Sequence, residues 1–527
     1  MRHGALRLNI AIPLQGITAA RRSIRLPAFL ASVLFLVTAS AVGQSTTPAT
    51  TLEELQKRLT EHVSQPKFDA AVWGVKIVSL DSGKTIFEHN PQKLLSPASN
   101  SKLYTVALAL DRLGADYRIK TSLYTLGKTN RWGTLKGDLV VYGRGDPGIN
   151  ARFHDNDIYK ALDPLVRALT NAGIRKISGD LVGDETFFRG LPFGSGWAWD
   201  DLENYYGAEI SSLTINDNTL QLTVKPGDRA GARCQVTLSP ATTYLVISNR
   251  TETTEKGTRR TIHSYRPLTE NVLYVSGNMP LESQAFNDDV TVHDPGGLFV
   301  WYFKEALARR GIKVRGKLRA VRALDPEDRF TDCDKMTEIG SIESMPLGEI
   351  AREVMKPSQN LYTDLLLASV GEKTRESDRR LSSEESGIRE LEKFLGEASV
   401  KAGDVLFEEG SGLSRNNLTT PNATVALLQF MNHHPCASAY LEALPIAGVD
   451  GTLKSRMKGT AAAGNVRAKT GTLRWAISLS GHVTTAGGGH WVFSVMLNRY
   501  HSSQGSAPGR AEIDSIAVML AEFVGKE

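Results

Sequence analysis

Apolar residues recur at helical spacing in the segment that follows Pro97. Leu103, Val106, Leu110 and Leu113 are three or four residues apart, which places them on one face of an α-helix. Proline is favoured at the first positions of a helix, so the pattern predicts a helix that begins soon after Pro97. The polar residues between this proline and the first of the leucines therefore lie at a helix N-terminus.

The pattern changes after this helix. Residues 117–294 consist mostly of short alternating segments separated by turn-forming glycine, proline and aspartate, which predicts β-strands. From residue 296 to the end, helical and strand-like segments alternate. We therefore expect one domain in two parts, residues 44–116 and 295–527, with a mostly β inserted domain, or pair of subdomains, over residues 117–294.

The N-terminus has the pattern of an export signal. Arginines precede an apolar run over residues 26–37, and small residues follow at 39–43. The run is too short to span a bilayer, and the order of segments is that of a cleaved signal peptide. We expect residues 1–43 to be removed, with cleavage between about Ala41 and Gly43, and the protein to be periplasmic with at most peripheral membrane association. An uncleaved anchor is the alternative.

Charge and cysteine content narrow the class of partner. The formal net charge is +5, but residues 1–43 carry five arginines and no acidic residue, so the rest of the chain is close to neutral. This argues against nucleic acid as the main partner.

Cys234, Cys333 and Cys436 are far apart in the sequence. They can form at most one disulfide, and their spacing fits no zinc site.

Ser99 and Lys102 stand at the start of the predicted helix. A separation of three residues brings both side chains to the same face of a helix. A serine hydroxyl is a weak nucleophile until a base removes its proton, and a lysine can be that base when burial or a nearby cation lowers its pKa. Ser-x-x-Lys also occurs at residues 64–67 and 455–458, so the spacing alone does not separate a nucleophile pair from a solvated helix turn.

A second candidate is Ser358-Gln359-Asn360. A proline ends one predicted helix just before this segment, and an apolar helix restarts just after it. Ser358 and Asn360 therefore lie in a tight turn that can project polar groups into a cleft. The hydroxyl could relay a proton to a leaving amine, and the amide could hold a substrate carbonyl and orient Lys102. Ser-x-Asn occurs twice more in the chain, and turn capping is the alternative role.

A third candidate is Lys469-Thr470-Gly471-Thr472, which contains the only Lys-Thr-Gly of the chain. The alternating residues before it and the glycine predict an edge strand that another backbone can approach closely. Lys469 and the hydroxyls of Thr470 and Thr472 would bind an anion such as a C-terminal carboxylate. The backbone N–H groups of Thr472 and Ser99 would form an oxyanion hole. A solvated lysine on an edge strand is the alternative.

Taken together and in this order, the three motifs resemble the active-site triplet of penicillin-binding proteins and serine β-lactamases. The separation of Lys102 from Ser358 is much longer than in β-lactamases and is similar to that in class C low-molecular-mass penicillin-binding proteins, the D-alanyl-D-alanine carboxypeptidase/endopeptidase family. Further matching stretches lie at 145–147, 179–184, 196–201, 213–218, 410–415 and 448–453. The chain departs from the family at Glu409, where an aspartate is common.

The resemblance implies an α+β multidomain hydrolase. Its β-lactamase/transpeptidase-like domain would hold a five-stranded antiparallel sheet flanked by helices, and it would need no metal or organic cofactor. Ser99 would attack the carbonyl of the penultimate D-alanine of a peptidoglycan stem peptide and form an acyl-enzyme. Lys102 would accept its proton, Ser358 would pass it to the leaving D-alanine, and Asn360 would hold Lys102 and the substrate amide. β-Lactams would acylate Ser99 and stay attached.

The resemblance also implies a substrate-binding set. Lys469, Thr470, Gly471 and Thr472 would hold the terminal carboxylate, and Asp184 would meet the diaminopimelate amine of the stem peptide. An endopeptidase that cuts D-alanyl–diaminopimelate cross-links would use the same catalytic residues. A non-catalytic peptidoglycan-binding or scaffolding protein is the alternative from a different class. The presence of the serine and both lysines favours an enzyme.

Overall fold

The computed structural model describes residues 47–324, 333–375, 380–502 and 505–527. The expected signal peptide, residues 1–43, lies outside this part of the chain. The helices are α1 (Leu52–Val63), α2 (Ser101–Leu113), α3 (Ile158–Asn171), α4 (Pro295–Arg309), α5 (Leu347–Met355), α6 (Asn360–Thr374), α7 (Ser383–Glu397), α8 (Pro421–Asn432), α9 (Ala437–Ala443) and α10 (Ala507–Glu522). Among the described residues, no helix has the length and apolar composition that crossing a membrane requires.

The first and last parts of the chain meet in one sheet. Its strands are β1 (Val72–Ser79), β2 (Thr85–His89), β20 (Arg467–Leu473), β21 (Ala476–Thr484) and β22 (His490–Asn498), in the order β2-β1-β22-β21-β20. All neighbours are antiparallel. The five-stranded antiparallel sheet expected from the sequence is thus present, and β20, which carries the Lys-Thr-Gly motif, is an edge strand.

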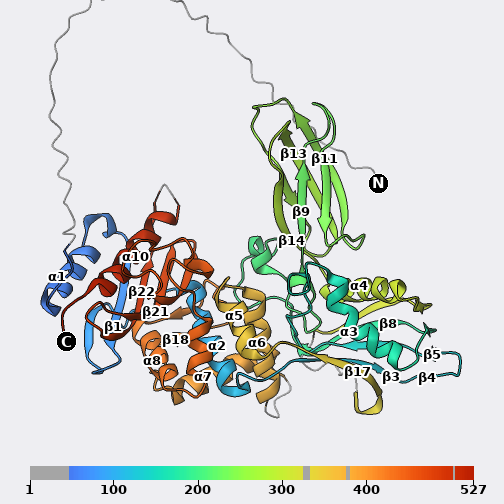
Figure 1. Cartoon of the computed structure of the whole chain (residues 1–527), viewed down its shortest axis with the longest axis horizontal. Coiled ribbons are helices and arrows are strands. Elements are labelled where there is room, and N and C mark those ends of the chain that lie inside the picture. Colours follow the sequence, from blue (N-terminus) through green and yellow to red (C-terminus); the bar gives the residue numbers. More distant parts are fainter. Residues whose placement is uncertain (1–46, 325–332, 376–379, 503–504) are drawn as a thin grey trace, which may run out of the picture. The chain divides into compact units, whose positions relative to one another are not determined.

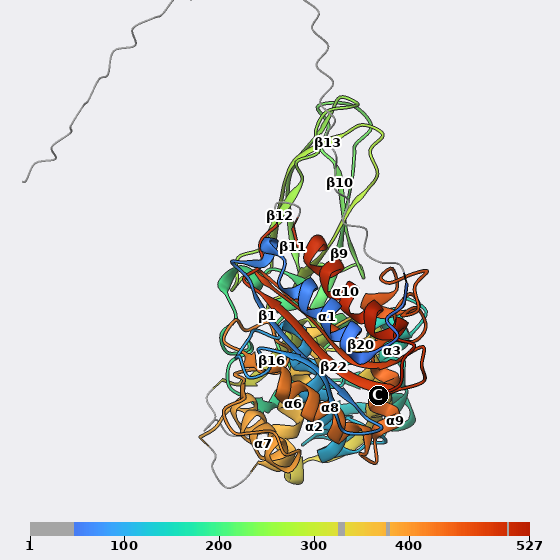
Figure 2. The same cartoon turned by 90° about the vertical axis from the view of Figure 1, so that its left-hand side faces the viewer.

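Helices cover both faces of this sheet, because successive side chains of a strand point to opposite faces. Phe493 and Val495 of β22 belong to one core, together with apolar residues of α1 and α10. Val492 belongs to a second core, among α2, α5, α6, α7, α8 and α9. Figure 2 shows α1 and α10 lying along the strands. Helix α2, which follows Ser99, is buried from Ser101 through Leu110.

The inserted region forms further sheets. One has the order β16-β8-β6-β3-β17 and another the order β15-β7-β5-β4, and α3 and α4 share a core with their strands. The strands are β3 (Lys120–Thr125), β4 (Lys128–Thr129), β5 (Thr134–Lys136), β6 (Leu139–Tyr142), β7 (Lys176–Ile177), β8 (Leu181–Arg189), β15 (Lys313–Val314), β16 (Leu318–Ala323) and β17 (Thr337–Glu343).

The middle of the inserted region is entirely strands and loops. Two three-stranded sheets have the orders β10-β9-β14 and β11-β13-β12, and Figure 1 shows their long strands side by side. The strands are β9 (Thr219–Lys225), β10 (Gln235–Ser239), β11 (Val246–Thr254), β12 (His263–Tyr265), β13 (Val272–Pro280) and β14 (Phe286–Thr291). A short pair, β18 (Val405–Leu406) and β19 (Leu418–Thr419), lies outside this region.

Strand pairing bears on the second domain boundary, which the sequence pattern put between residues 294 and 295. β16 pairs with β8 and β17 pairs with β3, and α4 shares a core with α3. These elements follow residue 294 but belong by contact to the inserted region. We therefore propose that the inserted domain extends to the end of β17, and that the second part of the catalytic domain begins at α5.

Candidate active site

Ser99 lies in a 3₁₀ turn (Ala98–Asn100) directly before α2. The first residue of this turn has a left-handed backbone, with φ of 48°, so the chain bends sharply and leaves Ser99 partly exposed between buried neighbours. Ser478 Oγ of β21 donates to the carbonyl of Pro97 at 2.6 Å. This bond fixes the turn to the sheet. The predicted helix is present and begins two residues after Ser99.

Lys102 is completely buried, with 0% of its surface exposed. Its Nζ donates to three oxygens: Ser99 Oγ at 3.1 Å, Asn360 Oδ1 at 2.7 Å and the backbone carbonyl of Ser411 at 2.6 Å. All three are uncharged, and among the described residues no carboxylate forms an ion pair with Lys102. A buried amine without a counter-charge loses its proton more readily than a solvated one.

Two carboxyl groups limit how far burial lowers the pKa of Lys102. Burial lowers the pKa of Lys102 to about 8, and the negative charges of Glu409 and Asp364 oppose the decrease. Glu409 is itself buried, but it accepts the backbone N–H groups of Ser411 at 2.8 Å and Gly412 at 2.7 Å. Burial raises the pKa of Asp364 well above its usual range. Lys102 can therefore exist as a neutral amine close to neutral pH, as a general base requires.

Ser358 and Asn360 lie where α5 gives way to α6. Ser358 has a left-handed backbone, with φ of 69°, and its Oγ accepts from Lys469 Nζ at 2.8 Å. The amide of Asn360 is held at both ends. Its oxygen accepts from Lys102, and its nitrogen donates to the backbone carbonyl of Tyr206, in the inserted region, at 2.9 Å. The turn thus touches both lysines of the site.

Lys469 is the second completely buried lysine. Its Nζ donates to Ser358 Oγ and to the backbone carbonyl of Thr470, both at 2.8 Å. Burial, together with the positive charges of Lys102 and Arg456, holds the pKa of Lys469 well below its usual value. An anion at this edge of the sheet would therefore favour the charged form of Lys469.

Gly471 lets β20 approach the turn of Ser99. A Cβ atom on this residue would lie 2.4 Å from the carbonyl oxygen of Pro97 and 2.2 Å from Ser478 Oγ, so any side chain would push the strand away. Thr472, the next residue, is exposed. Arg510 of α10 donates to its hydroxyl at 3.5 Å. Arg510 brings positive charge to the rim of the site, which we did not predict from the sequence.

Asp184 lies elsewhere in the structure. It is a buried residue of β8, and its Oδ1 accepts from the backbone N–H of Thr186 at 2.9 Å and from the hydroxyl of the same residue at 2.6 Å. It faces a cavity whose other lining residues include Asp138 and Arg319. Among the described residues, no hydrogen bond of Asp184 reaches the three motifs. The structure brings the other predicted residues together but leaves this one apart.

Sequence reasoning missed the backbone carbonyls of Ser411 and Tyr206, as well as Arg510. Ser411 lies in a stretch that matched the family, so a search of that stretch for a partner of Lys102 could have found it. A backbone acceptor such as Tyr206 leaves no trace in the residue type. Within the described ranges, no group of three or more His, Cys, Asp or Glu side chains could hold a metal ion.

Known proteins match this chain over most of its length. The family described as "D-Ala-D-Ala carboxypeptidase 3 (S13) family" matches residues 55–522. A D-alanyl-D-alanine carboxypeptidase of Actinomadura sp. (strain R39) is 33% identical over 488 residues, which are 90% of this chain and 86% of that protein. D-alanyl-D-alanine carboxypeptidase DacB of Haemophilus influenzae is 25% identical over 425 residues, which are 80% of this chain and 84% of that protein.

Solved structures show the same fold. The crystal structure of penicillin binding protein 4 (dacB) from Haemophilus influenzae matches with a TM-score of 0.75 and 23% identity, over 90% of this chain and 100% of that chain. The same protein complexed with a novel β-lactam matches with a TM-score of 0.68 and 22% identity, over 89% and 98%. The fold and family predicted from the three motifs are confirmed, and the chain belongs to the D-Ala-D-Ala carboxypeptidase 3 (S13) family.

Proposed function

We propose that this protein is a serine-type D-alanyl-D-alanine carboxypeptidase that acts on peptidoglycan stem peptides through an acyl-enzyme on Ser99. The contact of Ser99 Oγ with the buried Lys102 Nζ at 3.1 Å carries the proposal. The distance is within the reach that a general base needs. Because burial brings the pKa of Lys102 to about 8, a useful fraction of the lysine is neutral when substrate arrives.

Acylation begins when Ser99 Oγ attacks the carbonyl carbon of the penultimate D-alanine and its proton passes to Lys102 Nζ. The backbone N–H groups of Ser99 and Thr472 stabilise the oxyanion of the tetrahedral intermediate. The intermediate collapses, the carbon–nitrogen bond breaks, and the proton reaches the departing nitrogen through the hydroxyl of Ser358. The terminal D-alanine leaves, and the rest of the peptide stays on Ser99 as an ester.

Hydrolysis of this ester completes the cycle. Lys102 takes a proton from a water molecule, the hydroxide adds to the ester carbonyl, and Ser99 leaves with a proton restored to its oxygen. A β-lactam would form the same ester by opening its ring. Its nitrogen stays tethered to the acyl group after the bond breaks, so it remains close to the ester and hinders the approach of water.

The carboxylate of the terminal D-alanine would be held at the edge of β20. Lys469 supplies a positive charge, Thr470 and Thr472 supply hydroxyl donors, and Gly471 keeps the strand close to Ser99. Arg510 adds a second positive charge beside Thr472. Favourable electrostatics at a carboxylate would select substrates with a free C-terminus over amidated ones.

The test is the intact mass of the mature protein after incubation with benzylpenicillin, with the variant Ser99→Ala measured in parallel. We expect wild type to gain the mass of one whole penicillin molecule and the variant to gain none. Release of D-alanine from a peptide that ends in D-Ala-D-Ala should be lost in the same variant. Folded wild-type protein that neither gains mass nor releases D-alanine would favour the non-catalytic peptidoglycan-binding alternative.

The same residues would also cut D-alanyl–diaminopimelate cross-links, and we propose this endopeptidase activity alongside the carboxypeptidase. The two activities differ only in the leaving group, so a cross-linked substrate and a monomeric substrate are needed to distinguish them. A cross-linked peptide dimer should be converted to monomers by wild type but not by Ser99→Ala. An unchanged dimer, with D-alanine still released from monomers, would restrict the enzyme to carboxypeptidase activity.

We further infer that the enzyme is exported to the bacterial periplasm. The proposal rests on the arginines, the apolar run and the small residues within residues 1–43. N-terminal sequencing of the protein recovered from the cell envelope tests it. A mature terminus between Ala41 and Gln44 would support cleavage, whereas an intact Met1 would support an uncleaved anchor.

A further inference from the structure

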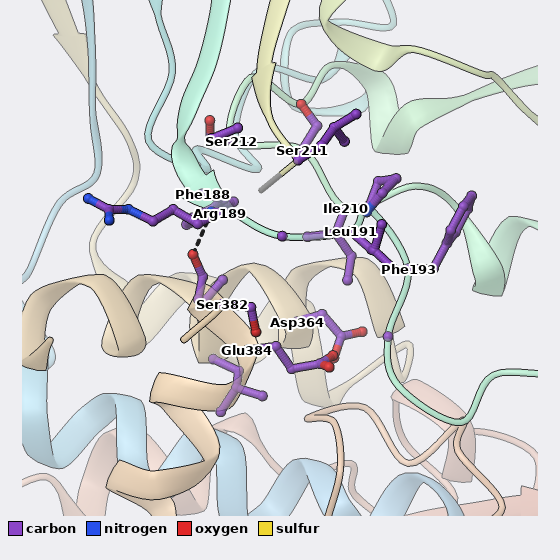
Figure 3. Close-up of a pocket in the computed structure, with 18 of the residues that line it drawn as sticks. Phe188, Arg189, Leu191, Phe193, Ile210, Ser211, Ser212, Asp364, Ser382 and Glu384 are labelled. Carbon is purple, nitrogen blue, oxygen red and sulfur yellow. Dashed lines mark hydrogen bonds between the residues drawn. The ribbon is translucent and has the colours of Figure 1, made fainter. Parts of the chain in front are cut away.

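A second cavity has a volume of about 500 Å³. It is enclosed by the end of β8 and the loop that follows, by the end of β16, by α6 and by the start of α7. No residue of the three motifs lines it. Part of its wall is apolar, and Figure 3 shows Leu191, Phe193 and Ile210 on one side. The volume is within the range of cavities that hold small organic ligands.

Two carboxyl groups lie together in this cavity, on Asp364 and Glu384 (Figure 3). Asp364 is 3% exposed, and its Oδ1 accepts the backbone N–H of Gly410 at 3.1 Å. Its Oδ2 is buried and has no hydrogen-bond partner. Glu384 accepts from the hydroxyl of Ser195 at 2.6 Å. Among the described residues, neither carboxyl group forms an ion pair.

The two arginines of the cavity are engaged by other acids. Arg322 donates to Glu185 at 3.1 Å and to Glu209 at 2.9 Å, and Arg189 lies 4.0 Å from Glu372. Arg322 is therefore paired with its own acids, whereas Glu372 is shared between Arg189 and Arg375. Among the described residues, the ion pairs of these arginines do not involve Asp364 or Glu384.

Lys102 donates no hydrogen bond to Asp364, because its three hydrogen bonds go to other oxygens, although its positive charge partly offsets the rise in the pKa of Asp364. Burial raises the pKa of Asp364, and Glu409 and Glu384 add to the increase. Burial also raises the pKa of Glu384, to about 7, and the charge of Glu409 adds to it. An acid held in this way ionises when a cation is placed beside it.

We propose that this cavity binds a small organic cation, with an ammonium group between Asp364 and Glu384 and an apolar body against Leu191 and Phe193. An ammonium donor would satisfy Asp364 Oδ2 through a charge-assisted hydrogen bond, which is stronger than a neutral one. A neutral ligand without a donor would leave this atom unpaired, and an anion would be repelled by both acids. The site is additional to the proposed hydrolase function.

Binding is best measured directly, because Asp364 also contacts the segment that holds Lys102. We would use benzylammonium, benzyl alcohol and benzoate as probes, which share one apolar body and differ in charge. Calorimetric titration of the mature enzyme should show benzylammonium binding at least tenfold more tightly than benzyl alcohol, and benzoate most weakly. Benzylammonium should still bind after acylation of Ser99 by benzylpenicillin, because Ser99 does not line the cavity.

Three variants decide whether the probe occupies this cavity. Asp364→Asn keeps an acceptor for Gly410 and should lose at least tenfold in affinity for benzylammonium, with little change for benzyl alcohol. Glu384→Gln makes the same test if Asp364→Asn fails to fold. Ala368→Leu places a larger side chain in the cavity wall without changing charge, and should weaken every probe that binds.

The proposal would be overturned by several results. Benzylammonium that binds no better than benzyl alcohol would remove the role of the acids. Undiminished affinity in both acid variants would do the same. Loss of binding on acylation, or full binding in Ala368→Leu, would place the probe outside the cavity.

Discussion

Arg322 of β16 is half-buried and Lys102 of α2 is completely buried, and these two cations differ in their partners. Arg322 faces three carboxylates, with closest contacts of 3.1 Å to Glu185, 2.9 Å to Glu209 and 3.6 Å to Asp294. Burial opposes its charge, but these acids hold the pKa of Arg322 above its usual value. Lys102 faces only uncharged oxygens, and burial lowers its pKa to about 8.

The comparison shows that burial alone does not prepare a group for proton transfer. Arg322 is half-buried, and the surrounding acids compensate for the water that its charged group has lost. Lys102 is buried, and neither Glu409 nor Asp364 is in direct contact with its Nζ. Its positive charge is therefore only partly compensated. A catalytic site can therefore be distinguished from a structural ion-pair cluster by the atoms that contact the cation. In the catalytic site these atoms are uncharged, and in the ion-pair cluster they are carboxylates.

The largest expected effect comes from Lys102→Arg. Arginine keeps the positive charge but does not lose its proton in proteins, so it cannot take the proton of Ser99. We expect acylation by benzylpenicillin to slow by about a thousandfold or more, as followed by intact mass against time. Lys160→Arg changes a lysine in an exposed ion pair with Asp155 and should acylate at the wild-type rate. A wild-type rate in Lys102→Arg would contradict the proposed role.

Arg322→Met tests whether the ion pairs of Arg322 stabilise the fold. It leaves Glu185 and Glu209 buried without their cation, which costs about 3–5 kcal/mol of unfolding free energy, measured by urea denaturation. Arg319→Met removes an exposed arginine that pairs with Asp180 and should cost less than about 1 kcal/mol. Folded Arg322→Met should still acylate normally. A stability loss no greater than that of Arg319→Met would show that the cluster is not structural.

The pH dependence of acylation should follow Lys102. Its folded pKa is lowered from 10.5 to about 8, and the neutral amine is the reactive form. The acylation rate should therefore rise about tenfold per pH unit below pH 8 and level off above it. Rate constants for benzylpenicillin measured from about pH 6 to about pH 10 would show this rise. A profile that is flat or falls with increasing pH would assign the proton to another group.

The smallest effect is expected for Arg510→Ala. Its contact with Thr472 is 3.5 Å long and exposed, so we expect KM for a D-Ala-D-Ala peptide to rise about two- to fivefold with little change in kcat. The same peptide with an amidated C-terminus should show no difference between wild type and variant. An equal loss for both peptides would mean that Arg510 supports β20 rather than the carboxylate.

The three motifs could be found in the sequence because motif residues depend on local spacing, and their resemblance to a known family implied the five-stranded sheet. Lys102 contacts Ser99, as their spacing predicted, and Asn360, as the resemblance to the family implied. Pairing between distant segments could not be predicted in the same way. β17 and β3 are neighbours in a sheet although their sequence patterns contain nothing specific to each other. The hydrophobic pattern therefore predicts a boundary at residues 294–295, whereas this pairing supports the later boundary that we propose.

Asp184 and Arg510 show the same limit at the level of single residues. Asp184 was selected from a matching stretch, but the direction of a strand side chain depends on which neighbours the strand acquires, and here its carboxyl group bonds to Thr186. Arg510 is an exposed residue of α10, and an exposed basic residue on a helix usually indicates a solvated face. Its reach to Thr472 depends on how α10 packs against the sheet.

The hydrogen bond from Asn360 Nδ2 to the carbonyl of Tyr206 has a consequence for protein engineering. A designer who wished to shorten this enzyme would be tempted to excise the inserted region and join the two halves of the catalytic domain. The excised piece would take with it the acceptor that keeps the amide nitrogen away from Lys102. The amide could then rotate and present a donor to the lysine in place of an oxygen, so a minimal enzyme would need a new acceptor at this position.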